Sequence, residues 1–96
     1  MKKGYWVVSY RTITDPQAVK NYSALAVPAI EAAGGRLLSR GIAVEAHEAG
    51  RLERTVLIEF DDVDKAKAAY ESDAYQKALA VLAGAAERDF RIVEGV

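Results

Sequence analysis

The stretch ERTVLIEFDDVDKAKAAYESDAYQKALAV, residues 53–81, predicts a strand that leads directly into a helix, followed by a break and a second helical run. Side chains of the strand alternate between two faces, one with Arg54, Val56, Ile58 and Phe60 and the other with Thr55, Leu57 and Glu59. The following pair of aspartates, Asp61 and Asp62, suits the amino end of a helix. Apolar stripes at helical spacing lie on both sides of Ser72 and Asp73, either of which can serve as a new N-cap. The break is therefore expected to be a corner at which the chain starts a helix again in a new direction.

The flanking sequence adds three strands and one long helix. Residues 4–13 are rich in β-branched and aromatic residues and predict the first strand. Asp15 can cap, and Pro16 can begin, an amphipathic helix that ends at the two glycines 34–35. The remaining predictions are extended segments at residues 36–46 and 88–94, a hairpin connection at 47–53, and a bulge or close approach at Gly41.

This order of elements is β-α-β-β-α-β, with the second helix in two pieces. It predicts an α+β, ferredoxin-like fold: one domain over residues 1–96, with a four-stranded antiparallel sheet and both helices on one face. Apolar side chains occur on both parities of the first and third predicted strands, so the second face of the sheet also needs a cover. A two-fold homodimer is the simplest supplier of that cover.

Composition excludes several classes of function. Thirteen Lys and Arg residues against fourteen Asp and Glu residues give a net charge of about −1, and the basic residues are scattered, so nucleic acid is not an expected partner. The chain has no cysteine and one histidine, which argues against zinc sites, iron–sulfur sites and thiol catalysis; no metal or other cofactor is expected. No signal peptide and no membrane-spanning run is recognisable, so a cytoplasmic location without membrane contact is expected.

Several motifs together resemble one known family. They are GYWVV at the start, a proline inside the first helix, GGRLLSRG after it, TVLIEF with an acidic corner, YESDAYQKAL, and the ending AAERDFRIVEGV. From about Gly4 to Val96 the chain resembles the bacterial "domain of unknown function 1330" family of the dimeric α+β barrel superfamily. The resemblance implies a ferredoxin-like protomer whose sheet packs against that of its twin.

The resemblance does not imply a reaction. The wider superfamily looks like a collection of cofactor-independent oxygenases, haem-degrading oxygenases, muconolactone-isomerase-like enzymes, polyketide cyclases and stress-response domains. The fold does not choose among these activities.

Two residues are candidate acid–base groups. His47, the only histidine, is the only side chain whose ordinary pKa lies near neutrality, and it is expected near the hairpin; the plainer interpretation is a solvated loop residue. Glu59 lies in a strand between apolar neighbours, where burial would raise its pKa unless an arginine paired with it; the plainer interpretation is an exposed or ion-paired carboxylate. Arg36 and Arg40 share one parity of the second strand and could reach Glu59 if the register allows.

Tyrosines are unusually frequent for so small a core, and they offer apolar area together with a hydroxyl. Tyr10 and Tyr70 are the tyrosines expected to face a ligand pocket, with Arg40 as a further ligand-binding residue. Packing in the core or in a dimer is the alternative role for the aromatic set.

These observations lead to two hypotheses. The first is a homodimer that binds a small anionic or aromatic metabolite between sheet and helices, in a pocket lined by Tyr10, Arg40, Glu59 and Tyr70. If the protein is an enzyme, the expected chemistry is cofactor-free proton transfer, isomerisation or oxygenation, with Glu59 or His47 as base. The alternative is a non-catalytic dimeric structural or interaction module without a ligand-sized cavity.

Overall fold

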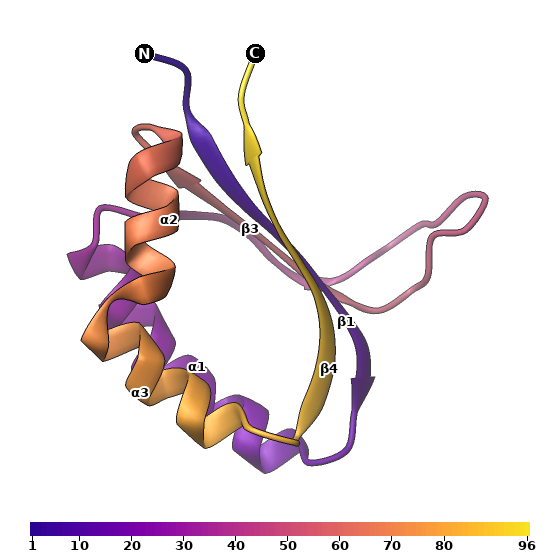
Figure 1. Ribbon diagram of the computed structural model, residues 1–96. Helices are drawn as coiled ribbons and strands as arrows, with labels where there is room; N and C mark the ends of the chain where they lie inside the picture. The colour runs from indigo at the N-terminus through magenta and orange to yellow at the C-terminus, as the bar shows by residue number, and fades with distance from the viewer.

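The computed structural model describes all 96 residues. Its elements are β1 (Gly4–Ile13), α1 (Pro16–Ala32), β2 (Arg36–Ile42), β3 (Arg54–Phe60), α2 (Val63–Glu71), α3 (Asp73–Leu82) and β4 (Ala86–Glu94). The four strands are antiparallel and lie in the order β2-β3-β1-β4, with the three helices on one face (Figure 1). The predicted ferredoxin-like α+β fold is therefore confirmed. No helix is long and apolar enough to span a membrane.

The helix boundaries follow from local caps. The Asp15 side chain accepts hydrogen bonds from the backbone N–H groups of Gln17 and Ala18, and Pro16 begins α1. At the other end Gly34 adopts a φ of 89°, a left-handed conformation that favours glycine. Ser72 separates α2 from α3, and its hydroxyl accepts from the backbone N–H of Tyr75. The predicted corner in the second helix is thus a true re-capping point.

The core lies between the helices and the sheet. Along β1 and β3 every second side chain is buried, and these side chains face the helices. The largest fully buried side chains are Trp6, Ile58, Phe60 and Tyr75. The indole N–H of Trp6 also donates to the backbone oxygen of Ala66 in α2 at 2.8 Å, which ties this helix to the sheet.

The helices do not approach the sheet equally. Backbone contacts join α2 to β1, β3 and β4, whereas α1 packs mainly on α3. The two helices α1 and α3 lie side by side at the end of the sheet where β4 begins (Figure 1). Side chains and a pocket therefore fill the space between α1 and the sheet.

The prediction of a bulge at Gly41 is wrong, because the bulge of β2 lies at Leu38. The β2–β3 register shifts between Leu37 and Ser39, and a Cβ added at Gly41 would meet nothing within 4 Å. An extra residue in a strand reverses the face to which the following side chains point. Arg36, which pairs with Glu59, therefore points away from the helices, while Arg40, which pairs with Val56, points toward them.

Two strand limits also differ from the prediction. β2 ends at Ile42 instead of Ala46, because the chain leaves the sheet and forms a loop that projects from the body of the protein (Figure 1). β4 begins at Ala86 instead of Arg88, and its first residues pair with Thr12 and Ile13.

Candidate functional site

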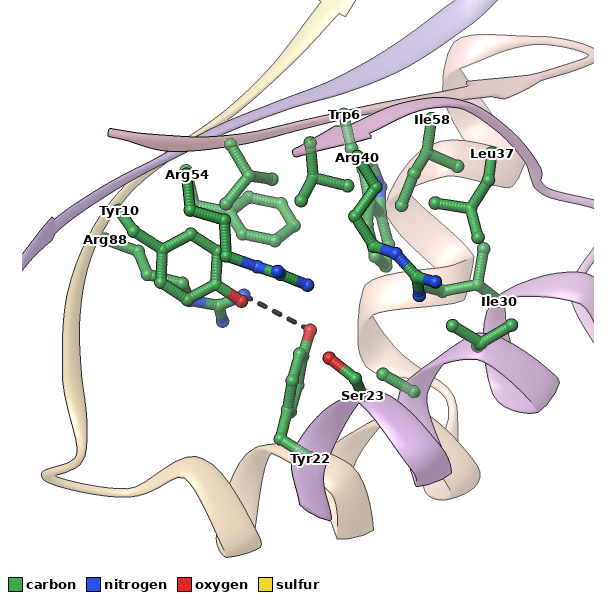
Figure 2. A pocket seen from close by; sticks show the side chains of 15 residues that line it. Trp6, Tyr10, Tyr22, Ser23, Ile30, Leu37, Arg40, Arg54, Ile58 and Arg88 are labelled. Atoms are coloured by element: carbon green, nitrogen blue, oxygen red, sulfur yellow. Dashed lines mark hydrogen bonds between the residues drawn. The ribbon is translucent and has the colours of Figure 1, made fainter. Parts of the chain in front are cut away.

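A pocket lies between α1 and the sheet at the end where β4 begins. Fifteen residues line it, and eleven of them are hydrophobic. The enclosed space is about 30 Å³. The polar side chains that face it are those of Ser23, Arg40, Arg54 and Arg88 together with the hydroxyls of Tyr10 and Tyr22 (Figure 2).

A wider cleft of about 370 Å³ adjoins this inner pocket. The two spaces share Ser23, Arg40 and Arg54 in their walls. The cleft is further lined by Ile13, Pro16, Val19 and Lys20. The site therefore has a small inner end and an open outer part, and every charged side chain in both parts is a cation.

Strand register brings the three arginines together. Arg54 has the same parity as Val56 and Ile58 in β3, so its side chain starts from the face that packs on the helices. Arg88 of β4 pairs with Tyr10 of β1, whose side chain also faces the helices. Arg40 reaches the same face because of the register shift in β2. In Figure 2, Arg40 and Arg54 extend from the strands toward Tyr22 and Ser23 of α1.

The three pocket arginines have no ion-pair partner. By contrast, Arg11, Arg36 and Arg91 each pair with a carboxylate elsewhere in the fold. The Nε atom of Arg54 is buried and makes no hydrogen bond. A buried donor without an acceptor is costly, so this arginine is held in the pocket at the expense of stability.

Aromatic rings support two of these guanidinium groups. The Cζ atom of Arg54 lies 5.5 Å from the centre of the Tyr10 ring, and that of Arg88 lies 5.1 Å from the Tyr22 ring. Such stacking holds a cation in place without neutralising its charge. The pocket therefore keeps a net positive charge available to a ligand.

Two tyrosine hydroxyls continue the polar contacts into the core. The hydroxyl oxygens of Tyr22 and Tyr75 are 2.6 Å apart, and Arg88 donates to the Tyr22 hydroxyl at 3.2 Å (Figure 2 shows the latter contact). Burial raises the pKa of both tyrosines above the ordinary value, so both hydroxyls stay protonated. Burial also opposes the charge of Arg88, but the nearby tyrosine oxygens outweigh this effect and raise its pKa.

The residues that the sequence suggested for one common site lie in four places. Tyr10 and Arg40 line the pocket. Tyr70 instead lines a separate open cleft of about 250 Å³ between the helices and β4. His47 lies in the projecting loop with 77% of its side chain exposed, in contact with the carboxylate of Glu45.

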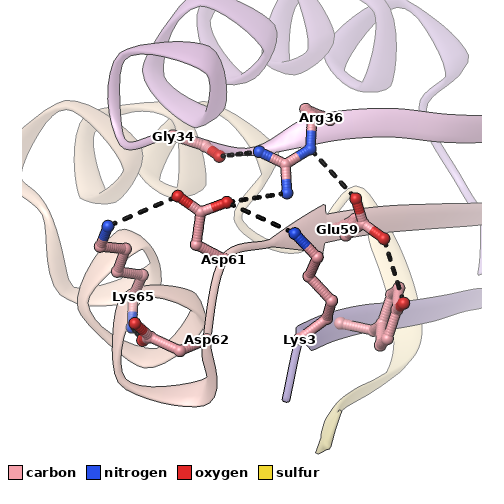
Figure 3. A network of polar contacts seen from close by, with 8 residues as sticks. Lys3, Gly34, Arg36, Glu59, Asp61, Asp62 and Lys65 are labelled. Carbon is pink, nitrogen blue, oxygen red and sulfur yellow. Dashed lines mark hydrogen bonds and ion pairs between the residues drawn. The ribbon is translucent and has the colours of Figure 1, made fainter. Parts of the chain in front are cut away.

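Glu59 lies on the face of the sheet opposite to the helices, so the expected pocket lined by Tyr10, Arg40, Glu59 and Tyr70 is not formed. Its carboxylate accepts hydrogen bonds from Arg36 and from the Tyr5 hydroxyl, both at 3.1 Å (Figure 3). These hydrogen bonds, with that of Arg36 the strongest, lower the pKa of Glu59. Arg40 does not meet Glu59, because the register shift in β2 sends Arg36 there instead.

Arg54, Arg88 and Tyr22 were not among the candidates from the sequence. The signal for Arg54 was visible, since an arginine shared the parity of Val56, Ile58 and Phe60 on the core face of its strand. A charge at such a position needs a reason, because long charged residues are rarely buried without a partner. Arg88 has the same relation to Phe90 on β4. For Tyr22 the helical stripe indicated only burial.

No group of three His, Asp or Glu side chains comes close enough to hold a metal ion.

The family model described as "Domain of unknown function (DUF1330)" matches residues 3–96. The chain belongs to the DUF1330 family. No curated protein matches the chain significantly.

Solved structures share the DUF1330 fold at low sequence identity. A protein of unknown function from Rhodopseudomonas palustris superposes with a TM-score of 0.74 at 13% identity, covering 99% of this chain and 83% of that chain. SnoaB, a cofactor-independent oxygenase from Streptomyces nogalater, gives a TM-score of 0.67 at 12% identity, covering 97% and 92%. A dimeric ferredoxin-like protein of unknown function from Thermobifida fusca gives 0.59 at 15% identity, covering 97% and 91%. These likenesses show the fold of the DUF1330 chain and leave its function open.

Proposed function

We propose that this DUF1330 protein binds a small organic anion in the pocket between α1 and the sheet. The observation that carries the proposal is the convergence of Arg40, Arg54 and Arg88, none of which has a carboxylate partner. Unpaired cations with apolar and aromatic walls are the recognition chemistry of an anion that also has an apolar body.

The dimensions of the site are consistent with a metabolite-sized ligand. The outer cleft of about 370 Å³ is within the usual range of small-molecule sites, and Lys20 adds a fourth cation there. The inner end of about 30 Å³ has room for only a few atoms. The ligand body would therefore occupy the cleft, with one polar group directed inward.

If the protein is an enzyme, we propose chemistry of the cofactor-independent oxygenase or isomerase type; SnoaB, which has the same fold, is described as a cofactor-independent oxygenase. Neither part of the site contains a carboxylate or an imidazole. Glu59 and His47, which the sequence suggested as bases, lie outside this pocket and out of reach of a ligand bound in it. The contribution of the pocket itself would be to stabilise negative charge on the ligand.

We also propose that the protein is a homodimer that joins through the open face of the sheet. Tyr5, Val7 and Leu57 lie on this face and are only partly covered within one chain. The Thermobifida fusca protein of the same fold is described as dimeric. A second copy would cover these apolar groups, as the alternation on both parities of β1 suggested.

The rival function is a non-catalytic dimeric module. It is favoured by the dense aromatic packing, in which the Trp6 ring centre lies 4.9 Å from that of Tyr75 and 5.0 Å from that of Phe90. In this reading the tyrosines fill the core and the pocket has no occupant.

Isothermal titration calorimetry with benzoate, salicylate and the neutral benzamide separates the two functions. We expect the anions to bind and benzamide to bind much more weakly. Arg54→Gln and Arg40→Gln should each weaken anion binding by about 10- to 100-fold, the usual value of one charge-assisted hydrogen bond. Arg51→Gln changes the net charge equally but lies in the projecting loop, so it should leave binding unchanged. Absence of binding by every anion would favour the non-catalytic module.

A further inference from the structure

The hydroxyl of Tyr22 has a defined direction of hydrogen bonding. Tyr75 is fully buried, and the Tyr22 oxygen is the only acceptor that its hydroxyl contacts. Tyr75 therefore donates to Tyr22, since otherwise its own proton would lack an acceptor. Arg88 donates to the same oxygen at 3.2 Å. With both lone pairs of its oxygen occupied, Tyr22 has its own proton free to point into the pocket that its side chain lines.

Arg54 supplies a second free donor at the same place. Its Nε–H group is buried and out of reach of a ligand, but no hydrogen bond within the protein uses its terminal N–H groups, and its side chain lies at the junction of the inner pocket and the outer cleft. Figure 2 shows the guanidinium groups of Arg54 and Arg88 on the side of the pocket toward which the Tyr22 hydroxyl points. The inner end is therefore a cluster of donors around a small space.

The cluster lacks groups that could accept a proton from a ligand. Its lining contains no carboxylate, carboxamide or imidazole, so hydroxyls are the only side-chain acceptors. A neutral phenol or enol would bring one more O–H donor into this set. The ionised oxygen of the same compound would accept from Tyr22 and Arg54 and would also neutralise part of the arginine charge.

The volumes place a small polar group at the inner end and the body of the ligand in the cleft. About 30 Å³ at the inner end holds a small polar group, whereas the cleft of about 370 Å³ has room for a ring. A phenol or enol presents its one oxygen on a planar body, which suits this division of the site.

We propose that the inner end of the pocket is an oxyanion hole that binds a phenol or enol as its anion, with Tyr22 and Arg54 as the hydrogen-bond donors to the ligand oxygen. On binding, the O–H bond of the ligand breaks and its proton passes to solvent, so no base from the protein is needed. The inference rests on the proposed anion-binding function and adds the class of ligand. It also assigns Tyr22, which was not a candidate from the sequence, as a ligand-binding residue.

para-Nitrophenol tests whether the ligand is bound as its anion, because the anion and the neutral form absorb at different wavelengths. The protein is titrated at a pH about one unit below the pKa of the free compound, where most of it is neutral. We expect the bound form to show the nitrophenolate spectrum. Binding should also release close to one proton per site, measured by calorimetry in buffers of different ionisation enthalpy.

Substitution of the proposed donor residues tests which side chains donate hydrogen bonds to the ligand oxygen. Tyr22→Phe should weaken nitrophenolate binding by about 10-fold or more, as for loss of a hydrogen bond to a charged group. Because this change leaves the Tyr75 hydroxyl without a partner, the double variant Tyr22→Phe, Tyr75→Phe is measured beside it, and it should bind equally weakly while remaining folded. Tyr5→Phe removes a hydroxyl on the opposite face of the sheet and should leave binding unchanged.

The outcomes separate this inference from the proposed function. Nitrophenol bound with the spectrum of its neutral form would overturn the oxyanion hole. Binding of benzoate without any binding of nitrophenol would also overturn it, since the ligand class would then be carboxylates, and the anion-binding function would stand. If neither compound binds, both proposals fail. Equal binding by Tyr22→Phe and the unaltered protein would remove Tyr22 from the site.

Discussion

Arg54 is a charged residue on the core face of a strand, and part of its guanidinium group has no hydrogen-bond partner. Its side chain starts from the buried face of β3, and its Nε–H group is buried without an acceptor. Arg40 and Arg88 bring further positive charge to the same pocket, and no carboxylate offsets it. An unsatisfied donor among like charges lowers the stability of the free protein, which is a common property of binding sites.

Replacing this arginine should therefore stabilise the protein and weaken its binding of anions. Arg54→Met removes the unsatisfied donor, a gain of about 1 to 3 kcal/mol, and loses the stacking on Tyr10, a cost of about 0.5 to 1 kcal/mol. We expect a net increase in the free energy of unfolding of about 1 kcal/mol, measured by urea denaturation without ligand. Saturating benzoate should raise the stability of the unaltered protein more than that of the variant.

Arg51→Met is the matched control, because Arg51 is exposed in the projecting loop. Its stability should change by less than about 0.5 kcal/mol. A loss of stability in Arg54→Met would show that the arginine is satisfied within the free protein and would contradict the proposed anion site.

Among the elements, the corner between α2 and α3 depends on one hydroxyl. The Ser72 oxygen accepts from the backbone N–H of Tyr75 at 3.3 Å, and its own proton is donated to the Ala69 oxygen at 2.8 Å. The corner turns α3 so that Tyr75 enters the core beneath Trp6 and beside Tyr22. A local cap thus positions the residue that directs the Tyr22 hydroxyl.

Removing the cap should weaken the fold by a modest amount. Ser72→Ala is expected to lower the free energy of unfolding by about 1 kcal/mol, the usual cost of losing an N-cap serine. Ser39→Ala, a change of an exposed serine in β2, should have an effect below about 0.5 kcal/mol. Equal effects of the two substitutions in chemical denaturation would mean that Ser72 does not cap α3.

A network of ion pairs lies where β2 begins and β3 ends. Arg36 contacts Glu59 at 3.1 Å and Asp61 at 3.2 Å, while Lys3 and Lys65 lie within 3.7 Å of Asp61 (Figure 3). The hydrogen bond from Arg36 lowers the pKa of Glu59, and the charge of Arg36 lowers the pKa of Asp61. The network joins β1, β2 and β3 to the beginning of α2.

This network predicts a dependence of stability on pH. A carboxylate whose pKa is lower in the folded than in the unfolded state stabilises the fold above its unfolded pKa, which is about 4 for Glu and Asp. The contribution is lost as the pH falls from about 5 through the folded pKa values. Arg36→Gln should therefore be less stable than the unaltered protein near neutrality, and the difference should shrink toward pH 3. Arg36 and Asp61 are solvent-exposed and Glu59 is partly exposed, so salt should reduce the difference.

Urea denaturation at a series of pH values measures this effect. Arg91→Gln serves as the comparison, because Arg91 pairs with Asp89 on the same face but outside the network. A difference between Arg36→Gln and the unaltered protein that stays constant between pH 6 and about pH 3 would contradict the assigned linkage.

For the whole molecule, the two faces of the sheet have different roles. One face holds the core and the arginine pocket under the helices. The other carries Tyr5, Val7 and Leu57 in partial exposure, with no element of this chain over them. A second copy packed there would leave the pocket open on the helical side, so assembly and ligand binding would use separate surfaces.

The proposed dimer predicts a measurable change of mass. By sedimentation equilibrium we expect the unaltered protein to have the mass of two chains. Leu57→Asp places a charge at the centre of the open face and should give the mass of one chain. Leu25→Asp, a matched change at an exposed position of α1, should leave the dimer intact. A one-chain mass for the unaltered protein at all concentrations would remove the dimer.

Most of the fold could be predicted from the sequence. The strand parity in residues 54–60, the caps at Asp15 and Ser72 and the glycine stop at residue 34 are all found where they were expected. Only half of the candidate pocket could be predicted, namely Tyr10 and Arg40. Glu59 was placed with them because the parity of β2 was read without the shift near Leu38.

The sequence by itself determined the order of elements, the break in the second helix and the identity of the buried strand faces. These properties depend on residues close together along the chain, through hydrogen-bonded caps and the periods of helix and strand. Only the tertiary structure decided which charges meet. Arg40, Arg54 and Arg88 come from three different strands, and a shift of one residue in one of them moves a side chain from one face of the sheet to the other. Such a shift depends on pairing between distant segments, for which a local pattern contains no signal.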